Sequence, residues 1–304
     1  MKTMRYSSIL VSGLFLLGMA ACESEDALVA EPDTLTECFA PDPDANDEVS
    51  AMQRKFYKEE GNYLLFTDTL RHEPLGLDSN GDMQYFTELL DLGYTLGNTS
   101  SVQAKSYTYG YLETISEKEE AVAFIKEYVL VHLPAGLRPF SWLLTTSIMD
   151  NSTYESLDAL SGQRGIAVAV GYALADMTEE EKSVLAASVL SATLSASLST
   201  KTTEMAPFYK FCQSLYHSYF NLVDYTDEEN MQKLKEFGFI TPYVTWGIEL
   251  MGVCPTSEQD VTSFIKLVMG YTQAEIAEMY AGYPIVIEKA QVMGNLIKEL
   301  GYID

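Results

Sequence analysis

The sequence predicts an α+β fold, with a small mixed sheet in the N-terminal half of the folded part and mainly helices in the C-terminal half. Three observations lead to this prediction. The predicted strands, which are rich in apolar, β-branched and aromatic residues, all lie before residue 171. Helix-start signals dominate after residue 177. Strands and helices do not alternate regularly, as they would in a parallel α/β sheet.

The first 21 residues have the features of a secretory signal peptide. Lys2 and Arg5 precede an apolar run over residues 9–21, which is too short to span a bilayer. The residues around the end of this run resemble the lipobox of bacterial lipoproteins, in which the cysteine, here Cys22, is acylated and becomes the first residue of the mature chain. We therefore expect lipidation at Cys22. The alternative is ordinary cleavage after small residues, which leaves a free thiol.

Residues 22–49 are expected to form an acidic flexible tether. Residues 23–50 contain ten acidic side chains, three prolines and no Lys or Arg, so this stretch cannot bury enough apolar surface to fold. Its self-repulsion favours an extended chain. The acidic cluster at residues 23–26 resembles the export signal of Bacteroidetes lipoproteins. That resemblance implies a lipid-anchored protein on the outer membrane, facing the cell exterior.

Residues 50–304 are predicted to form one domain, because the hydrophobic content is ordinary and no second low-complexity linker occurs. The net charge of −25 argues against nucleic acid as a partner, since phosphate binding needs clustered Lys or Arg. Besides Cys22, the chain has Cys38, Cys212 and Cys254, which lack the close spacing of a structural zinc site. A disulfide between Cys212 and Cys254 is compatible with export, although nothing in the sequence requires it.

The individual elements are predicted from residue patterns along the chain. Aromatic and β-branched runs predict strands at residues 62–70, 106–112, 140–148 and 166–170. A helix over residues 50–60 is expected to end at Gly61. Capping boxes predict the starts of four further helices, at Ser116/Glu119, Thr178/Glu181, Thr226/Glu229 and Thr272/Glu275. A last helix follows Pro284, with an apolar stripe of Val286, Ala290, Met293 and Ile297.

The three histidines are poor candidates for a metal site. His72 is followed by Glu73 and Pro74, and the proline interrupts the helix that a zinc motif H-E-x-x-H needs. His132 lies on the apolar stripe of a predicted helix and His217 in an aromatic helix, where packed histidines are more common than ligands. No nucleophile elbow, Walker loop or dinucleotide-binding turn occurs. The 44 acidic residues leave a glycosidase pair of carboxylates open.

Two other segments have candidate binding residues. Asp78, Asn80 and Asp82 match the first ligand positions of a calcium loop, but the later positions do not match, so we predict an Asn-Gly turn instead. A second segment places alternate tyrosines on one face of a strand. With Trp142 and Trp246 these tyrosines would form a platform for sugar rings, unless they pack in the core. They are Tyr107, Tyr109 and Tyr111.

Taken in order, the folded part resembles a family of Bacteroidetes lipoproteins identified as zinc-binding metallopeptidases with a gluzincin-like fold. The matching stretches are FYKEEGNYLLF at residues 56–66, the strand region at residues 133–148, FGFITPY at residues 237–243 and LGYID at residues 300–304. They extend over nearly the whole folded part. The resemblance implies a zincin-like α+β domain, in which the helix after the strand at residues 166–170 bears H-E-x-x-H.

The metal ligands of that family are missing from this sequence. The helix opened by Thr178 has Ala187, Ser188 and Ser191 at the positions of the first His, the Glu and the second His, and Ser263 stands at the later acidic ligand. A catalytic zinc ion is held by three protein ligands and activates a bound water. We therefore expect no zinc, no other cofactor and no peptidase activity.

The function we favour is non-catalytic binding of a peptide or protein ligand. The ligand would lie along a sheet edge, in the cleft where the resembled peptidases have their active site. Ser188, Ser191 and Ser195 lie on one side of the helix, and we expect this side to form a groove floor beside the sheet. The alternative is a helix packed all round, whose serines bond to carbonyls of the preceding turn. Other functions left open are glycan binding through the tyrosine strand, and a metallopeptidase whose ligands include His72, His132 or His217.

Overall fold

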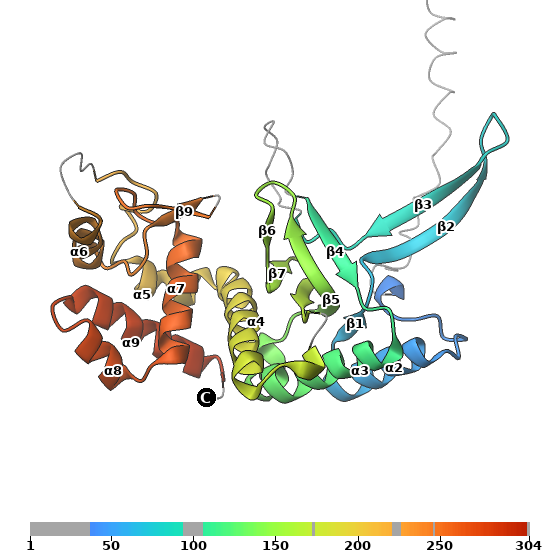
Figure 1. The fold of residues 1–304 in the computed structure, drawn as a ribbon, viewed down its shortest axis with the longest axis horizontal. Helices are drawn as coiled ribbons and strands as arrows, with labels where there is room; N and C mark the ends of the chain where they lie inside the picture. Colours follow the sequence, from blue (N-terminus) through green and yellow to red (C-terminus); the bar gives the residue numbers. More distant parts are fainter. Residues whose placement is uncertain (1–36, 94–105, 172–173, 221–225, 246, 303–304) are drawn as a thin grey trace, which may run out of the picture. The chain divides into compact units, whose positions relative to one another are not determined.

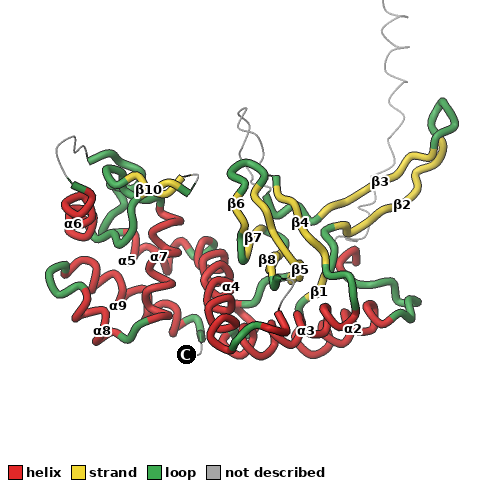
Figure 2. Tube along the Cα trace, viewed as in Figure 1, coloured by secondary structure: helices red, strands yellow, loops and turns green. Residues whose placement is uncertain are grey.

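The computed structural model describes residues 37–93, 106–171, 174–220, 226–245 and 247–302 (Figure 1). The predicted signal peptide, Cys22 and residues 23–36 of the predicted tether lie outside these residues, as does Trp246. The described part confirms the α+β prediction, with a mixed sheet in the N-terminal half and helices in the C-terminal half (Figure 2). No single described helix is long and apolar enough to cross a membrane. Only α4 (Glu179–Ser199) and α5 (Thr202–Tyr209), bent by 105°, meet that test when taken together.

The main sheet is built around one long strand, β5 (Ser141–Asp150). The strands along the sheet are β1 (Tyr63–Leu65), β5, β8 (Gly165–Ala169) and β7 (Ala159–Gly162). The strands β1 and β8 run parallel to β5, whereas β7 is antiparallel to β8. The far half of β5 also pairs with β4 (Tyr107–Tyr111) and β6 (Glu155–Ser156), both antiparallel. The predicted strands at residues 106–112, 140–148 and 166–170 are therefore confirmed.

Both faces of this sheet are covered, which explains why β5 is apolar along most of its length. Successive side chains of a strand point to opposite faces. Trp142 and Leu144 accordingly join the large core cluster beneath the helices, and Leu143 joins a second cluster on the other face. All three are fully buried. The second cluster also contains Phe39 and Leu90, so the segments before β1 and after the hairpin described below cover that face.

The folded unit begins at Cys38, so the prediction of a flexible tether is wrong for its last part. Phe39, in the short helix η1 (Glu37–Phe39), is only 2 % exposed, and its ring lies 4.9 Å from that of Phe140. Arg54 donates hydrogen bonds to the carbonyls of Asp42 and Ala45. This last part of the predicted tether has too few apolar side chains to fold alone. Its contacts with the rest of the domain hold it in place.

The first helices begin and end at residues with clear capping roles. Helix α2 (Glu48–Glu60) has Asp47 as its N-cap and ends at Gly61, whose φ of +76° is the left-handed conformation that favours glycine. Helix α3 (Ile115–Phe124) is capped by Thr114 and Glu117, so the predicted box at Ser116 and Glu119 was two residues too late. The chain continues as a π-helical turn, η2 (Ile125–Val129), and the 3₁₀ turns η3 (Leu130–His132) and η4 (Ala135–Leu137).

The C-terminal half consists mainly of helices around α7 (Ser257–Gly270), which packs against α4 and α9 (Pro284–Glu299). The capping boxes predicted at Thr178, Thr226 and Thr272 are confirmed, and a further box at Thr256 and Gln259 was not predicted. The remaining elements are η5 (Leu174–Asp176), α6 (Asp227–Phe237), α8 (Gln273–Met279) and the short hairpin of β9 (Tyr243–Thr245) and β10 (Ile248–Leu250).

A second hairpin, of β2 (Thr69–Leu77) and β3 (Met83–Leu89), forms a separate two-stranded sheet. The predicted Asn-Gly turn joins its strands. Asp78 accepts hydrogen bonds from the backbone N–H groups of Asn80 and Asp82, and Gly81 has a φ of +88°. The strand predicted over residues 62–70 is divided between β1 and β2, and most of this hairpin was not predicted.

Candidate functional site

Helix α4 is the element on which the sequence placed the candidate site. Thr178 Oγ1 accepts a hydrogen bond from the backbone N–H of Glu181, and the Glu181 carboxylate accepts one from the N–H of Thr178. Acidic residues in the first turn also interact favourably with the helix dipole. Leucine and valine side chains anchor α4 in the core, and the helix packs against β7, η2 and α7.

The structure separates the four positions that the resemblance assigned to lost metal-site residues. Ala187 is exposed and Ser188 is half-buried. Ser191 is 1 % exposed, and its hydroxyl has no hydrogen-bond partner among the described residues. Ser263 lies on α7, where its hydroxyl donates to the carbonyl of Asp260 at 2.8 Å.

The predicted groove floor of three serines is therefore wrong for two of them. Ser191 is buried, and the Ser195 hydroxyl lies 3.2 Å from that of Thr262 on α7. Helix α7 packs against α4, and Ser195 contacts it through Thr262. Ser188 and Ser195 are both half-buried, but of the three serines Ser188 alone lines the pocket described below. An imidazole at position 191 would have to displace packed neighbours, so the structure does not favour the register that places a ligand there.

A pocket of about 480 Å³ does lie beside the N-terminal half of α4. Ala187, Ser188 and Val184 form one wall. The other walls come from η2 and η3, from the end of α7 and from Tyr302 after α9; they include Glu127, Tyr128, His132, Lys266 and Met269. An apolar surface with a few polar groups is typical of a ligand site.

Two kinds of contact hold the rim of this pocket. The Tyr128 hydroxyl donates a hydrogen bond of 2.5 Å to Glu179, which raises the pKa of Tyr128 and lowers that of Glu179. The His132 ring stacks on Tyr302, with 5.9 Å between ring centroids. Lys266, by contrast, is exposed and has no polar partner within the part of the chain that the structure describes. The pocket therefore offers a cation for an anionic group of a ligand.

The strand β7 is the last strand of the main sheet and packs against α4. The register pairs Gly162 with Gly165 and Leu160 with Ala167. Hydrogen-bonded pairs alternate along an antiparallel ladder, so the backbone groups of Ala159 and Ser161 point away from β8. No hydrogen bond to these groups occurs among the described residues. The edge strand β7 therefore packs against α4, although none of its residues lines the pocket.

The tyrosine strand does not form the sugar-binding platform that the sequence left open. Tyr107 and Tyr109 on β4 pack against the second core cluster. The Tyr111 hydroxyl donates to Asp68 at 2.7 Å, and partial burial, together with this contact, raises the pKa of Tyr111 to about 12. A bulge between Gly110 and Tyr111 breaks the alternation of faces. Trp142, the other predicted partner, is fully buried.

The histidines lie on different elements. His72 is on β2, where its ring contacts Thr87 and stacks on Tyr85. The helix predicted around His217 does not form, since α5 ends at Tyr209 and His217 has a φ of +55°. No cluster of three or more His, Cys, Asp or Glu side chains suited to a metal occurs within the described ranges.

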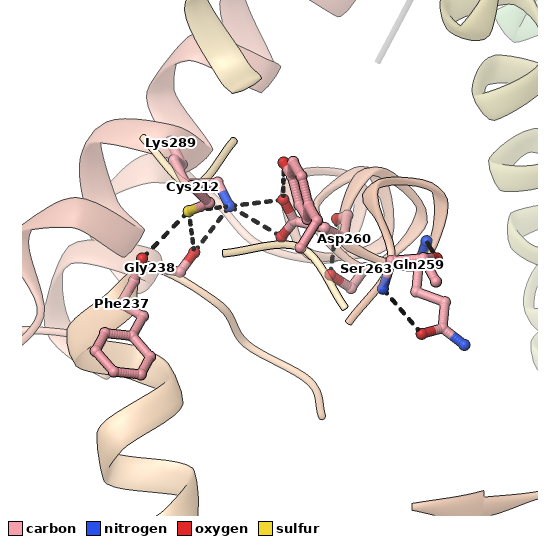
Figure 3. A network of polar contacts seen from close by, with 9 residues as sticks. Cys212, Phe237, Gly238, Gln259, Asp260, Ser263 and Lys289 are labelled. Carbon is pink, nitrogen blue, oxygen red and sulfur yellow. Dashed lines mark hydrogen bonds and ion pairs between the residues drawn. The ribbon is translucent and has the colours of Figure 1, made fainter. Parts of the chain in front are cut away.

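A buried charged centre in the C-terminal helices was not predicted (Figure 3). Lys289 on α9 and Asp260 on α7 are both 0 % exposed, and their side chains form an ion pair of 2.8 Å. The Lys289 ammonium also donates to the carbonyl of Gly238 at 2.8 Å and contacts Cys212 Sγ at 3.4 Å. The Tyr216 hydroxyl donates to Asp260 at 2.8 Å.

Aromatic rings enclose this charged centre. The ammonium lies 4.4–5.0 Å from the ring centroids of Phe208, Phe239 and Phe264, where cation–π attraction adds to the ion pair. Burial raises the pKa of Asp260, while Lys289 and Tyr216 act to lower it. Burial also raises the pKa of Cys212 to about 11, so its thiol is protonated at neutral pH. Cys212 and Cys254 are free thiols.

The role of this buried charged centre is to stabilise the fold. Its three kinds of acceptor match the three N–H groups of the ammonium, and the side chains are sealed from solvent. One sequence signal points to it, because Lys289 stands within the apolar stripe of the last helix, three residues after Val286 and one before Ala290. Asp260 likewise precedes Val261 on the buried side of α7.

No family model matches the chain, and neither a curated protein nor a solved structure matches it at a significant level. The similarity to zinc-peptidase-like lipoproteins therefore stays a prediction from sequence.

Proposed function

We propose that the chain is a lipid-anchored, zincin-like protein that binds a peptide or protein ligand without catalysing its hydrolysis, and that the pocket beside α4 is the binding site. The observation that carries the proposal is this pocket of about 480 Å³, whose wall includes Ala187 and Ser188. In the register that the sequence resemblance gives, these two positions correspond to the first His and the Glu of H-E-x-x-H, whereas the third position, Ser191, is buried and does not line the pocket. An alanine and a serine there leave room without supplying a ligand or a base.

Two further features support this proposal. The antiparallel strand β7 precedes β8, which leads into α4, and the outward backbone groups of β7 are suited to pairing with an extended peptide. Lys266 is positioned for a carboxylate of the ligand, while Val184 and Met269 offer apolar contact. The glycan-binding alternative loses its main support because Tyr107 and Tyr109 pack in the core.

Affinity selection with pooled random hexapeptides tests the proposal. Immobilised wild-type chain should retain a defined subset of the pool. Ala187→Trp should abolish this retention, because the indole would fill the pocket. Ala281→Trp is the matched control, since Ala281 is also an exposed alanine but does not line the pocket. Equal retention by both variants, or none by wild type, would contradict the proposal.

Metal analysis separates the binding protein from an enzyme. The chain purified from zinc-containing medium should hold far less than one zinc ion per molecule. Stoichiometric zinc together with peptide hydrolysis would overturn the non-catalytic part of the proposal.

The lipid anchor has its own test, because acylation requires the thiol of Cys22 and membrane retention follows from the attached acyl chains. Cys22→Ala should appear as a soluble or unprocessed form. A cleaved variant that stays in the membrane fraction would show that the lipobox interpretation is wrong.

A further inference from the structure

The β2–β3 hairpin exposes apolar side chains on a two-stranded sheet that pairs with no other strand in the described part of the chain. Large apolar residues that are 46–70 % exposed follow both strands; they are Leu75, Leu77, Met83, Tyr85, Phe86 and Leu89. An isolated two-stranded hairpin is at best marginally stable in water. Contiguous exposed apolar surface on a soluble domain marks an interaction site. The hairpin therefore has the properties of a sheet that lacks its next strand.

The two edges of this hairpin differ. The outer edge of β2 is interrupted by Pro74, which has no N–H group, and by two bulges, one of which includes Leu75. Gly76 beside it has a φ of +116°. Proline and bulges are the devices by which natural sheets block edge pairing. Strand β3 contains none of them, and every one of its residues has a partner on β2, so its outer edge is regular.

The register identifies the backbone groups at this regular edge. Backbone hydrogen bonds join Asp78 to Asp82 at the turn and Leu90 to Asp68 at the base. Hydrogen-bonded and non-hydrogen-bonded residue pairs alternate along an antiparallel ladder. Counting from either end of the hairpin places Met83, Tyr85 and Thr87 in the non-hydrogen-bonded pairs. Their N–H and C=O groups therefore point outward, and none has a hydrogen-bond partner among the described residues.

The side chains define the chemistry of a strand that fits this edge. Met83, Tyr85, Thr87 and Leu89 lie on one face, where their partners on β2 are Leu77, Pro74, His72 and Thr69. This face has no acidic residue, and the His72 ring stacks on Tyr85. The exposed charged residues of the hairpin are Glu73 and Asp82, which are both acidic, on a chain with a net charge of −25. Arg71, its one cation, is half-buried and pairs with Glu88.

We propose that the outer edge of β3 accepts an extended segment of another protein as a third strand, with apolar residues that alternate with basic residues. The apolar residues lie on the face of Tyr85, and the basic residues complement the acidic hairpin. Main-chain hydrogen bonds supply the affinity and the alternate side chains the selectivity. This interaction is separate from the pocket beside α4 and does not depend on the function proposed there.

Two other occupants fit the edge less well. A bilayer would have to accept the tip of the hairpin, where Asp78, Ser79, Asn80 and Asp82 are polar or charged. A second copy of the chain would bring acidic Glu73 and Asp82 against an equally acidic molecule, and like charges weaken such contacts.

Fluorescence anisotropy with the purified chain and a labelled octapeptide of alternating valine and lysine tests the proposal. Wild type should bind the peptide, but not the same peptide methylated on alternate backbone nitrogens. Tyr85→Lys should weaken binding by about tenfold or more, because an edge lysine opposes strand addition and repels a basic strand. Leu75→Lys, which adds the same charge on the bulged strand, should leave the affinity within about twofold.

Hydrogen exchange at Gln84 and Phe86, whose amides point toward β2, reports whether the hairpin is folded in each variant. Protection of the Met83, Tyr85 and Thr87 amides by the peptide would support the proposal. Absence of binding by wild type, or equal weakening by both lysine variants, would overturn it. So would binding of zwitterionic phospholipid vesicles, or peptide-free self-association, that Tyr85→Lys abolishes and Leu75→Lys preserves.

Discussion

Lys266 and Lys289 lie on packed helices of the same domain, yet their surroundings differ completely. Lys289 is fully buried, and its ammonium has a carboxylate, a carbonyl and a thiol as partners within an aromatic enclosure. Lys266 is exposed at the pocket beside α4 and has no polar partner among the described residues. The comparison teaches that the polar network around Lys289 stabilises the fold. The pocket beside α4, in contrast, offers the exposed ammonium of Lys266 to a ligand.

The largest expected effect comes from removing the buried cation. Lys289→Met should lower the free energy of unfolding by about 3–5 kcal/mol, because it leaves the Asp260 carboxylate buried without its partner. Lys266→Met should change it by less than about 0.5 kcal/mol. Urea unfolding of the two variants makes the comparison. Equal losses would show that the two lysines do not differ as described.

The double variant Lys289→Met, Asp260→Leu sharpens this test. Replacing both members of a buried ion pair by apolar residues is often close to neutral, so the second substitution should restore most of the lost stability. A double variant less stable than Lys289→Met alone would mean that the carboxylate does not need the cation.

A smaller loss is expected when the carboxylate keeps its cation but loses a hydrogen bond. Tyr216→Phe should cost about 1.5–3 kcal/mol, the usual range for a hydrogen bond to a charged group. Tyr219→Phe is the control, since Tyr219 is 77 % exposed. Thermal or urea unfolding measures both, and an unchanged Tyr216→Phe variant would contradict the importance of this bond.

The serines of α4 should show a still smaller effect, of opposite sign. Ser191→Ala should leave stability unchanged or raise it by about 1 kcal/mol, because the buried hydroxyl has no partner among the described residues. Thr193→Val should instead lower stability by about 1 kcal/mol, since the Thr193 hydroxyl donates to the carbonyl of Val189. A loss in both variants would indicate that Ser191 does have a structural role.

The smallest expected effect is a shallow loss of stability in acid. Hydrogen bonds from the capping-box backbone lower the pKa values of Glu117, Glu181, Glu229 and Glu275 below the ordinary value of 4.5. A lowered carboxyl pKa in the folded state contributes stability above the unfolded pKa, and this contribution is lost as the pH falls through the folded pKa. Stability measured below pH 4.5 should therefore decline, and the decline should be weaker in Glu181→Gln. An identical decline in that variant would contradict this assignment.

The sequence predicts local structure well where a few residues determine it. The boxes at Thr178, Thr226 and Thr272, and the glycine cap at Gly61, are set by neighbouring backbone groups, and the structure has them as predicted. The position of Phe39 could not be predicted in the same way. It depends on contacts with residues distant in sequence, such as Phe140 and Arg164.

The candidate site could be predicted only in part for the same reason. Spacing along α4 correctly grouped the serines on one side of the helix. That α7 covers this side, so that Ser191 is buried and Ser188 is not, follows from the packing of segments far apart in sequence. The ion pair of Lys289 and Asp260 joins two helices that are also separate in sequence. A lysine within an apolar stripe does, however, indicate a buried and paired charge.

Hydrogen–deuterium exchange of the chain, with and without the retained hexapeptides, tests the central claim most directly. If the pocket beside α4 is the binding site, protection should increase in residues 127–132, 183–190 and 266–270. The helices around Lys289 should show no comparable change. Protection confined to segments outside the pocket walls, or no change at saturating peptide, would contradict the claim.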